Sequence, residues 1–254
     1  MRNIALVLQF TLREALSKKL IITLFIVSTM AIVVIALLFQ LGDAMQITTN
    51  QQGKDLNVVN SGIKMLEMGF INSAFGLGLF LSVFATAGLI PDLLQKGNID
   101  LFLSKPITRE QLILGKFAGS VLIILLNIAY FVLALWVLVG LKFEFWGTGI
   151  LFSIVSITFA FAVLYSIMVF LGILTKSAVL PIIVSYLIYI ILSPLVANRE
   201  KFEQLGSEVL DSILEALHYI IPNTSEILRV TNKFIIGTGE PGWEPFIISF
   251  YIMV

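Results

Sequence analysis

The chain has 254 residues, of which 58% are hydrophobic and 13% are charged. Soluble domains carry about 25% charged residues, so this composition excludes an ordinary soluble domain and indicates an integral membrane protein. The 16 basic residues balance the 16 acidic ones, which argues against a nucleic-acid-binding domain. Cysteine is absent, so disulfides, thiolate metal sites and cysteine nucleophiles are excluded.

The first predicted element, residues 1–19, reads as an amphipathic helix. Polar side chains recur on one face at a spacing of four residues, at Gln9, Arg13 and Ser17. An apolar stripe follows another face, at Leu8, Leu12, Ala15 and Leu16. Such a helix lies in the membrane plane with its basic groups at the lipid headgroups. The alternative is a cytoplasmic extension of the first span.

Apolar runs of about 20 residues match the length of helix that crosses a bilayer. Five such runs contain no Asp, Glu, Lys, Arg or His: 20–41, 70–91, 117–141, 150–174 and 178–197. A sixth run, 246–254, covers only about half a bilayer. We expect it to be part of a truncated last span; a short terminal helix is the alternative. The expected fold is an all-α polytopic membrane protein with a single transmembrane domain over 1–254.

Lys and Arg are unevenly distributed outside these runs. With the N-terminus inside, the inner segments 1–19, 92–116 and 175–177 hold 9 basic residues in 47 positions. The outer segments 42–69, 142–149 and 198–245 hold 7 in 84. The inner segments thus carry a net charge of +5 and the outer ones −5. Because cytoplasmic segments are enriched in Lys and Arg, we expect a multi-pass protein of the cell inner (plasma) membrane with a cytoplasmic N-terminus.

The predicted spans lack the ionisable residues on which proton- or ion-coupled carriers usually depend, which weakens that class of function. His218, the only histidine, falls in an outer segment and is expected to be a face residue of an amphipathic helix. Gly115-Lys116 is followed by Phe117, so it does not complete a phosphate-binding loop. If this protein does work, we therefore expect the energy to come from another polypeptide.

The inner segment 92–116 has the pattern of a short helix joined by a rigid break to a membrane helix. Asp92 falls near a helix N-terminus and Gly97 is a natural helix stop. Lys105-Pro106 disfavours continued helix, and Thr108 with Gln111 predicts a capping box for a helix that runs through Lys116 into the third span. A passive interfacial loop is equally consistent with this local chemistry.

This segment resembles the signature of type-2 ABC transporter permeases, the ABC-2 family of exporter membrane subunits. The matching residues are Asp92, Gly97, Leu101, Phe102, Leu103, Ser104, Lys105, Pro106, Ile107, Thr108, Arg109, Gly115 and Lys116. The N-terminal helix, the six-span layout and the large outer segment before the last span are similar too, so the resemblance covers the whole chain. Asp92 departs from the pattern, because it replaces the family's usual Glu and is displaced.

The resemblance implies that residues 92–109 form a coupling helix that docks on a separate ATPase subunit. Two ATPase copies would bind the ATP, and two permeases would pair as a homodimer or heterodimer around the pathway. Lys105 and Arg109 are then expected to form charge pairs with the ATPase, Leu101 and Phe102 to fill its groove, and Pro106 to hold the angle to the third span. The alternative for Lys105, Arg109 and Lys116 is anchoring to lipid headgroups. No cofactor is expected in this chain.

The outer segment 198–245 is predicted to contain two helices. Apolar residues recur at helical spacing over 200–221, Pro222 ends that helix, and Asn223 with Glu226 predicts a capping box for a second one. Asn223-Thr224-Ser225 also matches the acceptor pattern for N-glycosylation. Helix capping is the preferred interpretation of these residues. The pair would close the outer mouth of the pathway, receive an extracytoplasmic accessory protein, or lie on the outer leaflet.

Small residues and prolines mark two of the spans. Ala74, Gly78 and Ser82 form a stripe that permits close approach of a neighbouring helix. Pro181 and Pro194 each remove a backbone hydrogen bond and are expected to bend the fifth span. In the related permeases spans 1 and 5 flank the dimer axis, so these residues are candidates for a gate or dimer face; packing within the chain is the alternative.

The sequence therefore favours the permease subunit of an ATP-driven exporter. A non-transporting membrane scaffold that binds a partner through its outer segment is the second hypothesis, and a secondary carrier is the third. The apolar spans suit hydrophobic cargo, but they suit simple lipid contact as well.

Overall fold

The computed structural model describes residues 2–44, 56–89, 108–199, 215–237 and 242–253, and all secondary structure in these residues is helical. Five helices are long and apolar enough to cross a membrane: Leu20–Gln40, Ser61–Thr86, Arg109–Phe143, Gly149–Thr175 and Val179–Ala197. The chain is thus an all-helical, multi-pass membrane protein. The coupling segment from Asp92 to Pro106 lies outside the described residues.

The first half of the chain forms α1 (Arg2–Ser17), α2 (Leu20–Ala44), α3 (Leu56–Ser73), the π-helical η1 (Ala74–Gly78) and α4 (Leu79–Thr86). The second half forms α6 (Arg109–Phe143), η3 (Gly149–Leu151), α7 (Phe152–Thr175), α8 (Val179–Tyr186), the π-helical η4 (Leu187–Leu192), α9 (Ser193–Ala197), α12 (Thr224–Ile236) and α13 (Glu244–Met253). Residues 215–220 are also helical.

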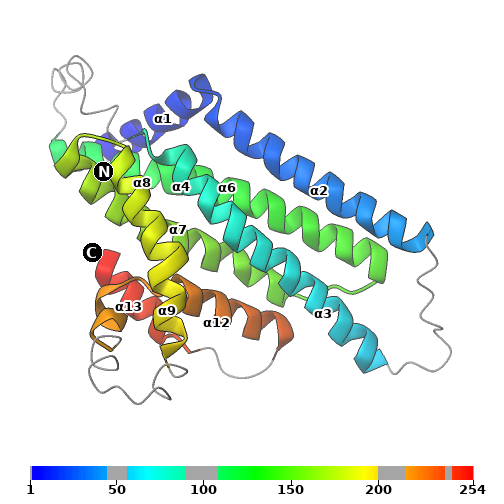
Figure 1. The fold of residues 1–254 in the computed structure, drawn as a ribbon. Helices are drawn as coiled ribbons and strands as arrows, with labels where there is room; N and C mark the ends of the chain where they lie inside the picture. The colour runs from blue at the N-terminus through cyan, green and yellow to red at the C-terminus, as the bar shows by residue number, and fades with distance from the viewer. Residues whose placement is uncertain (1, 45–55, 90–107, 200–214, 238–241, 254) are drawn as a thin grey trace.

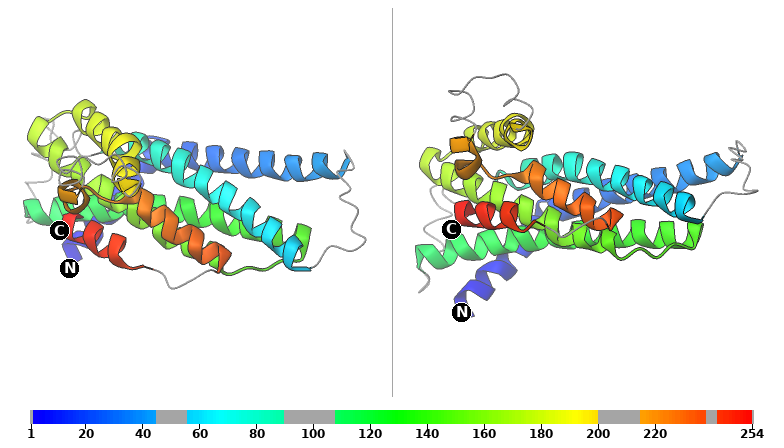
Figure 2. Two further views of the ribbon diagram at one scale, coloured as in Figure 1. Left: turned by 60° about the horizontal axis from the view of Figure 1, so that its bottom comes forward. Right: turned by 90° about the horizontal axis from the view of Figure 1, so that it is seen from below.

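The spans α2, α3–α4, α6 and α7 run side by side along the long axis of the molecule, whereas α8–α9 crosses them obliquely (Figure 1). In Figure 1 the helices α12 and α13 lie below α7, on the side away from α2, and they face the viewer when the molecule is seen from below (Figure 2). We call the end with α1 and the start of α6 the inner end, and the end with Phe143 the outer end, after the predicted orientation.

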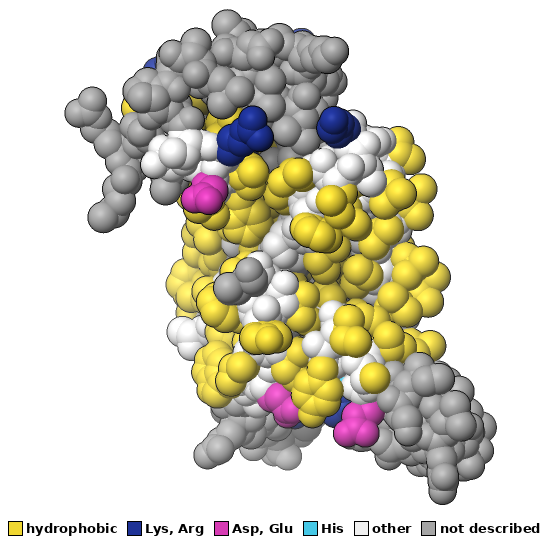
Figure 3. Space-filling model, turned by 90° about the vertical axis from the view of Figure 1, so that its left-hand side faces the viewer, with side chains coloured by type: hydrophobic (Ala, Val, Ile, Leu, Met, Phe, Trp, Pro, Cys, Tyr) yellow, Lys and Arg dark blue, Asp and Glu magenta, His cyan; other side chains and the backbone are white. Residues whose placement is uncertain are grey.

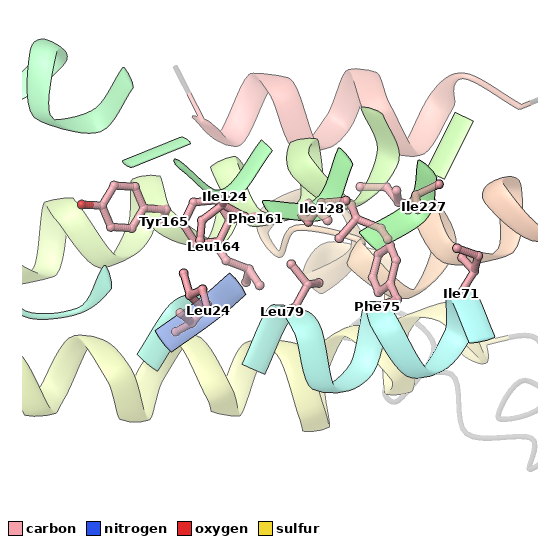
Figure 4. Packing of buried hydrophobic residues seen from close by; sticks show 14 of the residues in the cluster. Leu24, Ile71, Phe75, Leu79, Ile124, Ile128, Phe161, Leu164, Tyr165 and Ile227 are labelled. Atoms are coloured by element: carbon pink, nitrogen blue, oxygen red, sulfur yellow. The ribbon is translucent and has the colours of Figure 1, made fainter. Parts of the chain in front are cut away.

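The buried core forms where α3, η1 and α4 face α6 and α7. Ile71, Phe75 and Leu79 point toward Ile128 and Phe161 in this layer (Figure 4). Ile227 of α12 joins the same cluster at its outer side (Figure 4). Apolar side chains also cover much of the face drawn in Figure 3, and the charged side chains drawn there lie toward its two ends. This surface suits contact with lipid or with another membrane helix.

The third span begins where the sequence predicts. Thr108 Oγ1 accepts a hydrogen bond from Gln111 N at 3.3 Å, and Thr108 N donates to Gln111 Oε1 at 3.4 Å, so the capping box is confirmed. From this cap α6 continues for 35 residues without a break. The segment that resembles a coupling signature therefore leads directly into one long helix.

The second span differs from the predicted range of 70–91. Its helix starts at Leu56, and the candidate span Ser61–Thr86 includes Lys64 and Glu67. Lys64 Nζ donates to the Ile236 carbonyl at the end of α12, at 2.6 Å, and Glu67 is buried. The candidate span Ser61–Thr86 therefore carries two ionisable residues, both of which lie outside the predicted range of 70–91.

The fifth span departs from regular α-helix at η4, which lies between its two prolines. Pro181 lies in the first turn of α8, where its missing N–H removes no intrahelical bond, so the predicted bend there is wrong. Pro194 is the second residue of α9 and lies two residues after the end of the π-helical η4; a bend at this proline stays a prediction. The predicted sixth segment forms α13, which is too short to span a bilayer; its assignment to a sixth span stays a prediction.

Candidate coupling site at the inner end

The helix α1 lies directly on the inner part of α6. A Cβ added at Gly119 of α6 would lie 2.8 Å from Thr11 Cβ, so only glycine permits this close approach. The face of α1 turned toward the protein is the row of Val7, Thr11 and Ala15, all buried. Leu16, which the sequence places in the apolar stripe, is exposed, because close packing selects small residues for the contact face.

A buried ion pair joins the same two helices. Lys116 is 1% exposed, and its Nζ lies 2.5 Å from Glu14 Oε2 of α1. The same Nζ donates to the Leu89 carbonyl at 3.3 Å, just beyond the end of α4. Glu14 Oε1 in turn lies 3.0 Å from Lys18 Nζ, which is exposed to solvent. Lys116 therefore connects α1, the end of α4 and the start of α6.

The next turn of α6 extends this connection to α7. Ser120 Oγ lies 2.9 Å from the Tyr165 hydroxyl, and both residues are fully buried. The Phe117 ring stacks on the Tyr165 ring at a centroid distance of 5.6 Å. Elements from four parts of the chain thus meet within two turns of α6.

The structure describes two of the predicted coupling residues. Arg109 is the first residue of α6 and is exposed, which leaves it accessible to a partner. Lys116 is enclosed by Glu14 and Leu89, so it is not placed for direct contact with an ATPase. The remaining candidates, Asp92, Gly97, Leu101, Phe102, Ser104, Lys105 and Pro106, lie outside the described residues, and their roles stay predictions.

Sequence reasoning missed Glu14. The available signal was that it is the only acidic residue among the first 19, on an otherwise basic helix. Nothing in the local pattern indicates its partner, which lies 102 residues further along the chain.

A family model described as ABC-2 family transporter protein matches residues 11–251. The chain belongs to the ABC-2 transporter family. ABC-2 permeases are non-catalytic membrane subunits that generally pair with ABC ATPase subunits, so this chain is a transporter membrane component. The comparison with curated proteins finds no match.

In this ABC-2 protein the predicted small-residue stripe faces its own chain. Ala74, Gly78 and Ser82 line a cleft between α2 and the η1–α4 segment. Pro181 is buried near the start of α8, and Pro194 is the second residue of α9. Packing within one chain thus accounts for the position of the stripe, and a role for these five residues in a gate or dimer face stays a prediction.

The outer helices of the ABC-2 protein are held by hydroxyl groups from the fifth span. Ser193 Oγ accepts from Ser225 N at 2.9 Å and from the Thr224 hydroxyl at 3.0 Å, and thereby caps α12. Asn223 makes no side-chain cap, so the predicted capping box there is wrong; its amide instead donates to His218. Asn223 is fully buried in this arrangement, which disfavours glycosylation of the folded chain.

A buried histidine lies at the centre of this outer cluster. His218 Nδ1 accepts from Arg199 Nη1 at 2.5 Å and from Asn223 Nδ2 at 3.0 Å, so the ring proton lies on Nε2. Glu226 Oε1 lies 3.5 Å from Arg199 Nη1. Burial lowers the pKa of His218, and the Arg199 guanidinium lowers it further, against opposing effects of Glu244 and Glu215. Within the described ranges no group of three or more His, Asp or Glu is placed to hold a metal ion.

Proposed function

We propose that this chain is the membrane-spanning permease of an ATP-driven exporter, works as a dimer with two ATPase subunits, and has its N-terminus in the cytoplasm. The observation that carries the proposal is the continuity of the inner end. The segment that resembles the coupling signature ends at the Thr108 cap and leads into a 35-residue helix. Lys116 joins that helix to α1 and to the end of α4.

In this proposal the ATPase subunits contact residues 92–109 and move them when ATP is bound. Arg109 provides an exposed cation at the first turn of α6, where it can pair with an acidic group of the ATPase. The ion pair between Lys116 and Glu14 transmits the movement to α1 rather than contacting the ATPase. The energy is supplied entirely by the partner subunits.

Charge reversal at Arg109 tests the coupling step. The complex with its ATPase is purified and ATP hydrolysis is measured for the wild type, Arg109→Glu and the control Lys142→Glu. Lys142 lies in the last turn of the same helix, at the opposite end. We expect Arg109→Glu to abolish permease-stimulated hydrolysis and the control to retain it. Equal stimulation by all three proteins would overturn the role of Arg109, and failure of any ATPase to associate would favour the scaffold hypothesis.

The orientation can be tested with single cysteines, because the chain has none of its own. Ser17→Cys at the end of α1 and Lys142→Cys at the end of α6 mark the two sides. In intact cells we expect a membrane-impermeant maleimide to label the second position and to label the first only after permeabilisation. The reverse pattern would overturn the proposed orientation.

A further inference from the structure

One cleft among the described residues lies within the span bundle and is partly open to its surface. The cleft, of about 350 Å³, lies between α2 on one side and α3, η1 and α4 on the other, over a floor formed by α6 and Ile157 of α7. Its volume falls in the range of about 300–1,000 Å³ that small-molecule sites occupy. None of the residues that line it is charged. A charged ligand would therefore lack a counter-ion here.

The cleft has the length and opening of a site filled from the bilayer. Its lining on α2 extends from Leu24 to Ile35, about 17 Å along the helix, which approximates half of a hydrocarbon core about 30 Å thick. At its outer end the rings of Phe39 and Phe70 meet edge to face, with centroids 5.9 Å apart. Val34 and Leu77 line the cleft and are also exposed on the surface of the span bundle.

A single polar group is available in the floor of the cleft. Asn127 of α6 is 8% exposed, and its Oδ1 accepts from Ser28 Oγ at 3.2 Å. Its Nδ2 has no hydrogen-bond partner among the described residues. Because buried amide groups are normally paired, this N–H group is an unsatisfied donor on a residue that lines the cleft.

The wall opposite α2 has an irregular backbone at the same level. The π-helical η1 widens the helix there, and such single-turn irregularities are frequent at functional sites. Tyr189 donates to the Phe75 and Gly76 carbonyls of η1 and thereby holds the wide turn in place. A Cβ added at Gly78 in this wall would meet no atom within 4 Å, so the space beside it is open.

We propose that this cleft binds a neutral, elongated, lipid-like molecule that enters from the bilayer and accepts a hydrogen bond from Asn127 through an oxygen within its chain. Apolar side chains enclose the hydrocarbon part of the ligand, and Asn127 fixes its position along the cleft. The site is a property of this chain alone and does not depend on which partner supplies energy.

The test uses the full-length protein in lipid nanodiscs without any ATPase. The probe is a 16-carbon ketone that carries a photoreactive diazirine, compared with a diazirine alkane of the same length. We expect saturable labelling of peptides from α2 and from residues 70–82, with the ketone favoured over the alkane about threefold to tenfold, as for one net hydrogen bond. Labelling that does not saturate, or that maps elsewhere, would overturn the proposal.

Two variants separate the cavity from the hydrogen bond. Gly78→Leu fills the cleft and should abolish labelling, whereas Gly69→Leu, on the same span and outside the cleft, should not alter it. Asn127→Leu keeps the side-chain size but removes the amide donor. The ketone and the alkane should then label this variant equally. Thermal unfolding followed by tryptophan fluorescence establishes that each variant is folded. Unchanged labelling of Gly78→Leu, or a retained ketone preference in Asn127→Leu, would contradict the proposal.

Discussion

Lys116 Nζ and Glu14 Oε2 lie 2.5 Å apart and join the first helix of the chain to the start of its third span. This contact lies at the inner end, where the coupling signature enters α6. Breaking a buried ion pair by removing one partner costs about 3–5 kcal/mol, because the other charge is left without compensation. An exposed pair contributes about 0–1 kcal/mol.

Replacement of Lys116 by Met should therefore detach α1 from the bundle. We expect amide exchange of residues 2–17 to rise strongly in Lys116→Met, while Lys18→Met, which removes only the exposed cation beside Glu14, leaves it nearly unchanged. Hydrogen–deuterium exchange of the complex provides the measurement. If both variants behave alike, the buried pair does not hold α1.

A side chain at Gly119 should have a related effect by steric means. Gly119→Val places branched carbons against Thr11, whose Cβ is already 2.8 Å from the position of an added Cβ, and overpacking of this kind costs about 1–3 kcal/mol. We expect a lower melting temperature and weaker stimulation of the partner ATPase. The matched control is Gly62→Val, since no atom lies within 4 Å of a Cβ there. Equal melting temperatures for the two variants would show that α1 adjusts without cost.

The hydroxyl of Tyr189 should stabilise the contact between the second and fifth spans. Tyr189→Phe removes the hydrogen bonds to the Phe75 and Gly76 carbonyls, at 3.1 and 3.3 Å, and should destabilise the protein by about 1 kcal/mol. Tyr251→Phe, at an exposed position of α13, is the control and should be neutral. Thermal unfolding in nanodiscs compares them, and a neutral Tyr189→Phe would mean that the carbonyls of η1 find other donors.

The outer cluster should loosen in acid. Since the pKa of His218 is lowered from its usual 6.5 by burial and by Arg199, the folded state favours the neutral ring. The stabilisation is complete above about pH 6.5 and is lost as the pH falls through the lower folded-state pKa. Protonation of Nδ1 would also end the hydrogen bonds from Arg199 and Asn223.

We therefore expect amide exchange of residues 215–236 to increase between pH 7 and pH 5, after correction for the intrinsic rate. His218→Gln should remove most of this pH dependence. An acid response of equal size in the variant would assign it to Glu226 or to another carboxylate.

The sequence predicted the helix cap and the spans whose formation depends only on neighbouring residues. The cap at Thr108 depends on a residue three positions away, and the spans α2, α6 and α7 depend on long uncharged runs. The start of the second span could not be predicted in this way. Lys64 breaks the apolar pattern of the sequence, but the acceptor of its Nζ is the Ile236 carbonyl, 172 residues further along the chain.

The candidate site shows the same limit. The approach of Thr11 to Gly119, the burial of Lys116 and the capping of α12 by Ser193 all depend on tertiary packing between distant segments. A charged residue next to an apolar run has the same local pattern whether it faces a partner, a lipid headgroup or a buried carboxylate. Only the fold distinguishes Arg109, which is exposed, from Lys116, which is enclosed.

The unbroken geometry of α6 has a mechanical consequence. Its 35 residues make a rod about 52 Å long, considerably longer than the hydrocarbon thickness of a bilayer. A tilt of only about 5° around the midpoint of such a rod displaces its two ends by about 2 Å in opposite directions. A displacement of Arg109 would thus move Phe143 in the opposite direction. One rigid helix would bring the surrounding helices closer together at one end of the protein while it separates them at the other.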